Sequence, residues 1–137
     1  MHRKILLWGI GLALVAVILG AFGAHALKAI LSPEKLQSYE TGVRYQLIHA
    51  VALITLAIYG QQYASTTGVN KSLGLVAVFF IVGSFLFSGS IYGLAILSLT
   101  QSKAASILGP ITPLGGLSFM LGWVIWGRLV WSNKAHM

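Results

Sequence analysis

Four long runs of apolar residues, separated by short polar segments, dominate the chain. They cover residues 5–26, 43–63, 73–97 and 108–131. A helix needs about 20 mostly apolar residues to cross the hydrocarbon core of a bilayer. The pattern therefore predicts an all-α integral membrane protein: four transmembrane helices in an antiparallel bundle, forming a single domain over residues 1–137.

The polar stretch before the second run has the features of a helix start. Ser32 can cap a helix, and Pro33 suits the first helical position because its missing N–H would have no partner there. We expect an amphipathic interfacial extension to lead from Pro33 into the second span. Glu40 and Arg44 stand four residues apart on it, in the order that favours an ion pair at the helix surface.

Small residues form a narrow stripe, within about 80° of arc, on the first predicted helix. They are Gly9, Ala13, Ala16, Gly20 and Gly23. Such stripes let helix backbones approach closely in lipid. The sequence Ala24-His25-Ala26 resembles a signal-peptide cleavage site, but the apolar run before it exceeds the roughly 7–15 residues of such a peptide. We therefore expect this segment to be retained as a spanning helix.

A second face, on the third predicted helix, combines small and hydroxyl-bearing residues within about 80° of arc. It consists of Gly74, Ala77, Ile81, Ser84, Ser88, Tyr92 and Ala95, and a regular helix turns Ser90 away from it. This face is expected to pack through hydrogen bonds between helices. The alternative is that it forms the wall of a polar cavity.

An antiparallel bundle brings polar residues from different helices into one leaflet. They define a candidate polar pocket of Tyr45, His49, Ser84, Ser88, Tyr92 and Thr112. His49 is its principal residue, because an ionisable side chain within a span needs a partner or water. Either it is a neutral imidazole bonded between packed helices, or it lines a hydrated site. His25 is a weaker candidate, since it projects away from the small-residue stripe.

The composition narrows the chemistry. Only 8% of the residues are charged and the formal net charge is +7, but the basic residues are scattered through the termini and turns without forming a stripe, which argues against nucleic-acid binding. Without cysteine there is no thiolate metal site. The only carboxylate side chains are Glu34 and Glu40, so we expect no enzyme, metal or cofactor; a haem held by His25 and His49 is the less favoured alternative.

The positive start of the chain and the tryptophans near its two ends favour a cytoplasmic location for both termini. Several sequence blocks are similar to those of the domain of unknown function 423 family of small membrane proteins. These blocks are "GAFGAHAL", "YETGVRYQLIHA", "FLFSGSIYGLAI", "LGPITPLGG" and "FMLGW". The resemblance implies a four-helix protein of the bacterial plasma (inner) membrane that keeps its first helix. The family offers no established catalytic residues to carry over.

Two functional hypotheses follow. The first is a non-enzymatic envelope protein, embedded in the lipid bilayer, that acts through helix–helix association with itself or with another membrane protein. It rests on the small-residue faces. The second is an oligomeric channel or transporter for ions, protons or small solutes that uses the polar residues around His49 as its pathway.

Overall fold

The computed structural model describes residues 1–63, 69–100 and 108–132, and every regular element in these ranges is helical. The elements in chain order are α1 (His2–His25), the 3-10 helix η1 (Leu27–Ala29), α2 (Pro33–Gln62), α3 (Val69–Gly83), the π-helix η2 (Ser84–Gly89), α4 (Ser90–Leu99) and α6 (Ile111–Ser132).

These elements form four helices that are long and apolar enough to cross a membrane. The third is one continuous span from Val69 to Leu99, made of α3, η2 and α4. The predicted all-α transmembrane fold is thus confirmed. The second helix begins at Pro33 as expected, and the Ser32 hydroxyl accepts a hydrogen bond from the Lys35 backbone N–H. The last helix begins at Ile111, later than the predicted residue 108.

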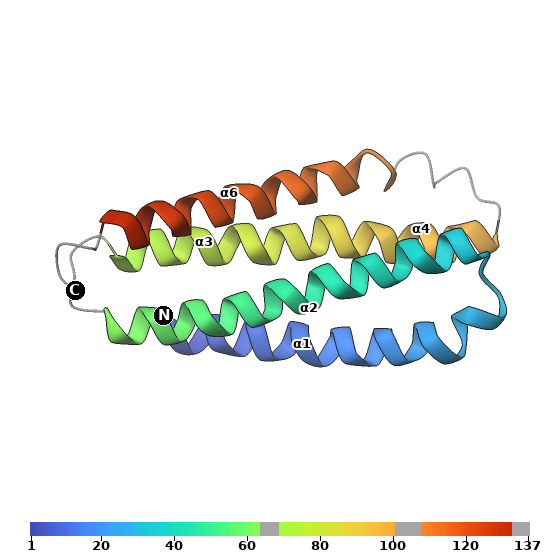
Figure 1. Ribbon diagram of the computed structural model, residues 1–137, viewed down its shortest axis with the longest axis horizontal. Helices are drawn as coiled ribbons and strands as arrows, with labels where there is room; N and C mark the ends of the chain where they lie inside the picture. Colours follow the sequence, from blue (N-terminus) through green and yellow to red (C-terminus); the bar gives the residue numbers. More distant parts are fainter. Residues whose placement is uncertain (64–68, 101–107, 133–137) are drawn as a thin grey trace.

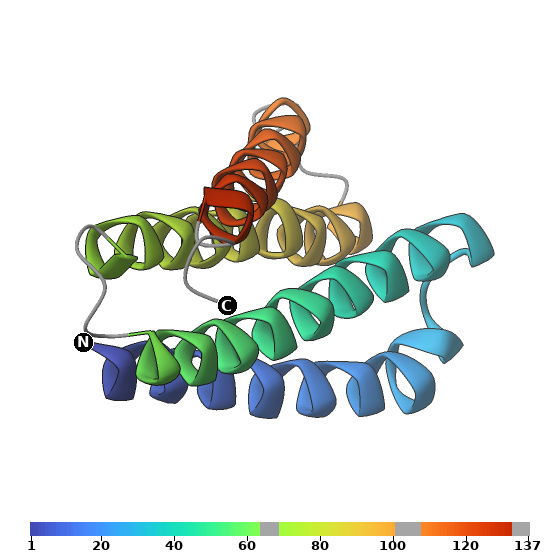
Figure 2. The ribbon, with the colours of Figure 1, turned by 60° about the vertical axis from the view of Figure 1, so that its left-hand side comes forward.

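The four spans run antiparallel (Figure 1). Helix α1 packs along α2, and α6 packs along α3, so that α2 and the third span lie in the middle of the molecule (Figure 2). Helix α1 begins and α6 ends at one end of the bundle, here called the terminal end. The opposite end, where α1 joins α2 and α4 ends, is called the loop end.

Helices α1 and α2 pack closely through the small residues of α1. A Cβ atom at Gly9 would lie 2.9 Å from the carbonyl oxygen of Ala50, and one at Gly23 would lie 2.7 Å from the ring of Tyr39. The stripe found in the sequence therefore faces α2 of the same chain. In the sequence analysis this stripe supported association with other molecules. In the structure it packs against a helix of the same molecule.

The π-helix η2 changes the register of the third span. Its turns are wider than α-helical turns, so the residues after Gly89 are rotated relative to a regular helix. Ser90 is only 4% exposed, and its Oγ lies 2.7 Å from Oγ1 of Thr112. Ser88, on the small-and-hydroxyl face, bonds to Gly42 of α2, so Ser90 points to a different neighbour, α6.

Candidate functional site

His49 lies near the middle of α2, and both of its ring nitrogens are bonded within the chain. Nδ1 is 2.7 Å from the carbonyl oxygen of Tyr45, and Nε2 accepts the indole N–H of Trp123 at 3.1 Å. A carbonyl oxygen can only accept and an indole N–H can only donate. These contacts assign His49 the neutral tautomer with the proton on Nδ1.

Aromatic rings surround the His49 imidazole. Phe119 of α6 stacks on it with ring centroids 3.4 Å apart and planes 10° apart, and Phe80 of α3 meets it edge-on at 5.2 Å. The His49 side chain is only 3% exposed. The imidazole thus serves as a flat packing element that joins α2 to the third span and to α6.

A second polar link joins α1, α2 and α4. The Tyr92 hydroxyl donates to Oε1 of Gln46 at 2.9 Å, and Nε2 of Gln46 donates to the Leu12 carbonyl oxygen at 2.9 Å. Gln46 is 4% exposed. In lipid a buried amide without partners is costly, and here both ends of the Gln46 amide are satisfied by neighbouring helices.

Serine hydroxyl groups near these residues donate hydrogen bonds to backbone carbonyl oxygens. Ser88 donates to the Gly42 carbonyl oxygen at 2.8 Å, linking η2 to α2, and Ser118 donates to the Phe79 carbonyl oxygen at 2.7 Å, linking α6 to α3. Ser84 donates to the Phe80 carbonyl oxygen of its own helix at 2.9 Å. We call Gln46, His49, Ser84, Ser88, Ser118 and Trp123 the mid-depth layer.

The residues of the predicted pocket do not all line one cavity. Tyr45 and His49 line a cavity of about 300 Å³, whereas Ser84 and Tyr92 line another of about 430 Å³. Tyr92 joins Gln46, while Thr112 joins Ser90 nearer the loop end. Tyr45 is 40% exposed, and its ring packs on Phe87 with centroids 4.7 Å apart. The structure thus divides the set into separate bonded groups.

Three members of the mid-depth layer were missed in the sequence: Gln46, Ser118 and Trp123. Gln46 carried a usable signal, because it is an amide inside an apolar run, one turn before His49. Trp123 was interpreted only as an interfacial anchor. Pairing it with His49 requires the relative placement of α2 and α6, which helix periodicity does not provide.

The remaining candidates lie outside this layer. Glu40 and Arg44 are both exposed on α2, and the structure, which describes both residues, shows no ion pair between them. His25 is exposed at the end of α1, and its Nδ1 lies 2.9 Å from the Ala21 carbonyl oxygen of its own helix. Their proposed roles remain predictions.

The haem alternative finds no support in this geometry. His49 has no ring nitrogen left for iron, and His25 sits at the loop end of α1. Within the described ranges no three His, Asp or Glu side chains gather as possible metal ligands.

A four-span helical bundle with internally bonded polar side chains at mid-depth defines a small multi-pass membrane protein. The chain belongs to the family described as "Protein of unknown function (DUF423)", whose pattern matches residues 19–116. The resemblance inferred from the sequence blocks is thereby confirmed.

Relatives from distant organisms extend over most of the chain. The UPF0382 membrane protein YwdK of Bacillus subtilis is 42% identical over 82% of this chain and 84% of its own length. A UPF0382 membrane protein of Haemophilus influenzae is 37% identical over 79% and 77%, respectively. One of Schizosaccharomyces pombe is 38% identical over 80% and 86%. No solved structure matches. These names describe membrane proteins and specify no reaction or ligand.

Proposed function

We propose that the protein is a non-enzymatic component of the bacterial inner membrane that associates with helices of membrane proteins through the outer face of α6. The observation that carries this proposal is the closed mid-depth layer. Its imidazole, amide and hydroxyl groups bond to the chain's own atoms, which supports a role for them in holding the helices together. The lipid-facing surfaces are then the parts of the spans that remain free to act.

The outer face of α6 differs from the small-residue face of α1. A groove of about 330 Å³ opens on it, lined by Trp123, Trp126, Gly127, Val130 and Trp131. A Cβ atom at Gly127 would meet no described residue within 4 Å. A glycine beside large aromatic side chains leaves room for the backbone of a neighbouring helix, the geometry that favours association in lipid.

Cysteine crosslinking tests this proposal cleanly, because the chain contains no cysteine. Val130→Cys places a thiol in the α6 groove, and Leu7→Cys places one on the exposed side of α1, near the same end of the bundle, as the matched control. Oxidation in native membranes detects a second copy, and a thiol-reactive photocrosslinker detects other helices. We expect a discrete product from Val130→Cys alone.

Gly127→Leu places a bulky side chain in the groove and should abolish that product. Equal crosslinking from both cysteine positions, or an unchanged product in Gly127→Leu, would contradict the proposal. The molecular mass of the product distinguishes self-association from binding of another protein.

The transport hypothesis gains no support from a single chain. Among the described residues, the polar groups around His49 are divided by Phe80 and Phe119 and engaged in internal bonds. Reconstituted liposomes provide the direct test. Flux of protons, ions or small solutes that His49→Ala abolishes would favour transport over association.

We further infer that both termini face the cytoplasm. In the described structure Arg3, Lys4, Lys71 and Arg128 lie at the terminal end, against Lys28, Lys35 and Arg44 at the loop end, and the positive start of the first helix usually has the most weight. Positive residues concentrate on the cytoplasmic side of membrane proteins. Labelling of Lys28→Cys by a membrane-impermeant maleimide in intact cells, with no labelling of Lys4→Cys, is the expected result.

A further inference from the structure

We propose that the pocket at the loop end, between α2, α4 and the start of α6, binds the headgroup of an ethanolamine phospholipid. The pocket has a volume of about 310 Å³, within the usual range of small-ligand sites. Lys35, Ser38 and Thr41 line it from α2, Ile91 and Leu94 from α4, and Thr112 from α6. This site is separate from the α6 groove and from the mid-depth layer.

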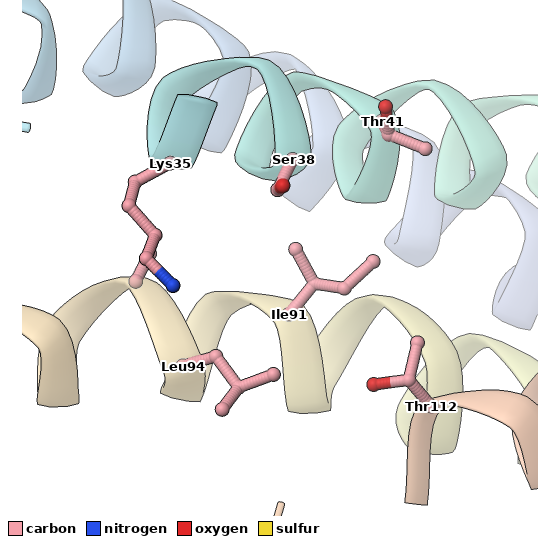
Figure 3. Close-up of a pocket in the computed structure, with 7 residues that line it drawn as sticks. Lys35, Ser38, Thr41, Ile91, Leu94 and Thr112 are labelled. Atoms are coloured by element: carbon pink, nitrogen blue, oxygen red, sulfur yellow. The ribbon is translucent and has the colours of Figure 1, made fainter. Parts of the chain in front are cut away.

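Lys35 supplies the positive charge of the pocket. Its side chain extends from the first turn of α2 across the space toward α4 (Figure 3). Within the described part of the chain, its ammonium group has no ion pair or hydrogen bond. An unpaired ammonium at the membrane–water interface is complementary to a lipid phosphate, which lies at that level of the bilayer.

Two hydroxyl groups supply acceptors rather than donors. Ser38 already donates its proton to the Glu34 carbonyl oxygen at 3.1 Å. Ser90 donates to the Phe87 carbonyl oxygen, so Thr112 must be the donor in its 2.7 Å contact with Ser90. The oxygens of Ser38 and Thr112 turn toward the space in Figure 3 with lone pairs still available.

A cation beside acceptor oxygens matches a zwitterion that carries N–H donors. The phosphate of the lipid pairs with Lys35, and the primary ammonium of ethanolamine donates to the hydroxyl oxygens. A choline headgroup has the same charges but no N–H, so it cannot make the second set of bonds. The donor and acceptor pattern therefore selects ethanolamine over choline.

The apolar floor of the pocket identifies the ligand as a lipid rather than a free phosphate ester. Ile91, Leu94 and Ala95 line its α4 side. They belong to the third span, which continues into the hydrocarbon core. A headgroup held at Lys35 thus has its acyl chains directed along α4.

Native mass spectrometry of the full chain, with equal amounts of phosphatidylethanolamine and phosphatidylcholine, tests the proposal. We expect about a fivefold excess of the ethanolamine adduct, corresponding to roughly 1 kcal/mol for charge-assisted contacts at a partly exposed site. Lys35→Gln and Ser38→Leu should each reduce the excess to nearly one. Lys28→Gln removes an exposed lysine at the same end of the bundle, outside the pocket, and should leave the excess unchanged.

Glycerophosphoethanolamine, which has the headgroup without acyl chains, separates the two sources of this chemistry. It should compete weakly or not at all, since the apolar floor would remain empty. Equal adducts of both lipids, an equal loss of preference in Lys28→Gln and Lys35→Gln, or strong competition by the free headgroup would each overturn the proposal. Retained thermal unfolding temperatures of the variants in micelles exclude misfolding as the cause.

Discussion

Polar side chains gather at two depths of this bundle, and the two groups differ in whether their polar atoms have hydrogen-bond partners within the chain. In the mid-depth layer, His49 and Gln46 satisfy their polar atoms with groups of neighbouring helices. At the loop-end pocket, Lys35 has no such partner in the described chain. Water and headgroups are absent at mid-depth but available at the interface, so depth determines whether a polar residue must be closed internally. Here the deeper polar atoms are satisfied within the bundle, whereas the Lys35 ammonium has no partner among the described residues.

The largest effect on the free energy of unfolding is expected from removing the His49 side chain from the mid-depth layer. His49→Ala removes a ring stacked on Phe119 and leaves the Trp123 N–H without its acceptor. We expect a loss of about 3 kcal/mol in the free energy of unfolding, from the cavity and the unsatisfied donor together. His25→Ala, which removes an exposed side chain, should change it by less than about 0.5 kcal/mol. Unfolding in mixed micelles measures both; equal losses would refute a packing role for His49.

Two adjacent glycines of α6, Gly115 and Gly116, allow a test of the close backbone contact between α6 and η2. A Cβ at Gly115 would collide with the backbone nitrogen of Phe87, whereas one at Gly116 would lie 3.9 Å from the Phe87 ring. Gly115→Ala should cost about 2 kcal/mol of stability through overpacking. Gly116→Ala should be neutral or stabilise by up to about 1 kcal/mol, because alanine favours the helix. Similar thermal unfolding shifts for the two variants would show that α6 does not depend on this approach.

The two stacked tryptophans of α6 offer a finer comparison. Trp123 donates to His49, while the indole nitrogen of Trp126 is buried and has no hydrogen-bond partner among the residues that the structure describes. Trp123→Phe should lower the unfolding free energy by about 1 kcal/mol, as expected for one hydrogen bond between membrane helices. Trp126→Phe loses no such bond and should be close to neutral in the same micelle titration. The reverse order would contradict the assigned tautomer of His49.

The smallest stability effect is expected at the loop-end pocket. Lys35→Gln removes an exposed charge without a partner in the described chain, so the unfolding free energy should change by less than about 0.5 kcal/mol. Chemical unfolding in lipid-free micelles checks this value. A loss comparable to that of His49→Ala would place Lys35 among the structural residues and remove the contrast between the two depths.

Helix periodicity was sufficient for the spans and for the inward direction of several residues. His49, Ser84 and Ser88 were expected to point inward, either into helix packing or toward a polar cavity, and each is at most 3% exposed. Apolar length determines whether a segment spans a membrane, and this property is local to the segment. The start of α2 at Pro33 could be predicted because the capping signal of Ser32 and Pro33 is also local to the segment.

The pairing of residues from different helices could not be predicted in this way. The Trp123 contact depends on how α6 rotates and slides against α2, and many such placements satisfy the same apolar pattern. This pairing depends on the placement of two helices relative to each other, which the sequence pattern of a single helix does not determine.

The neutral His49 has a consequence for how the protein responds to membrane voltage. No Asp, Glu, Lys or Arg occurs in residues 5–27, 45–62, 72–99 or 111–127, and His49 adds no charge at mid-depth. Moving one elementary charge through a potential of about 100 mV involves about 2.3 kcal/mol. Because these segments carry no such charge, we expect the membrane potential to do little work on the spans, and the bundle to keep the same conformation in an energised and a de-energised cell.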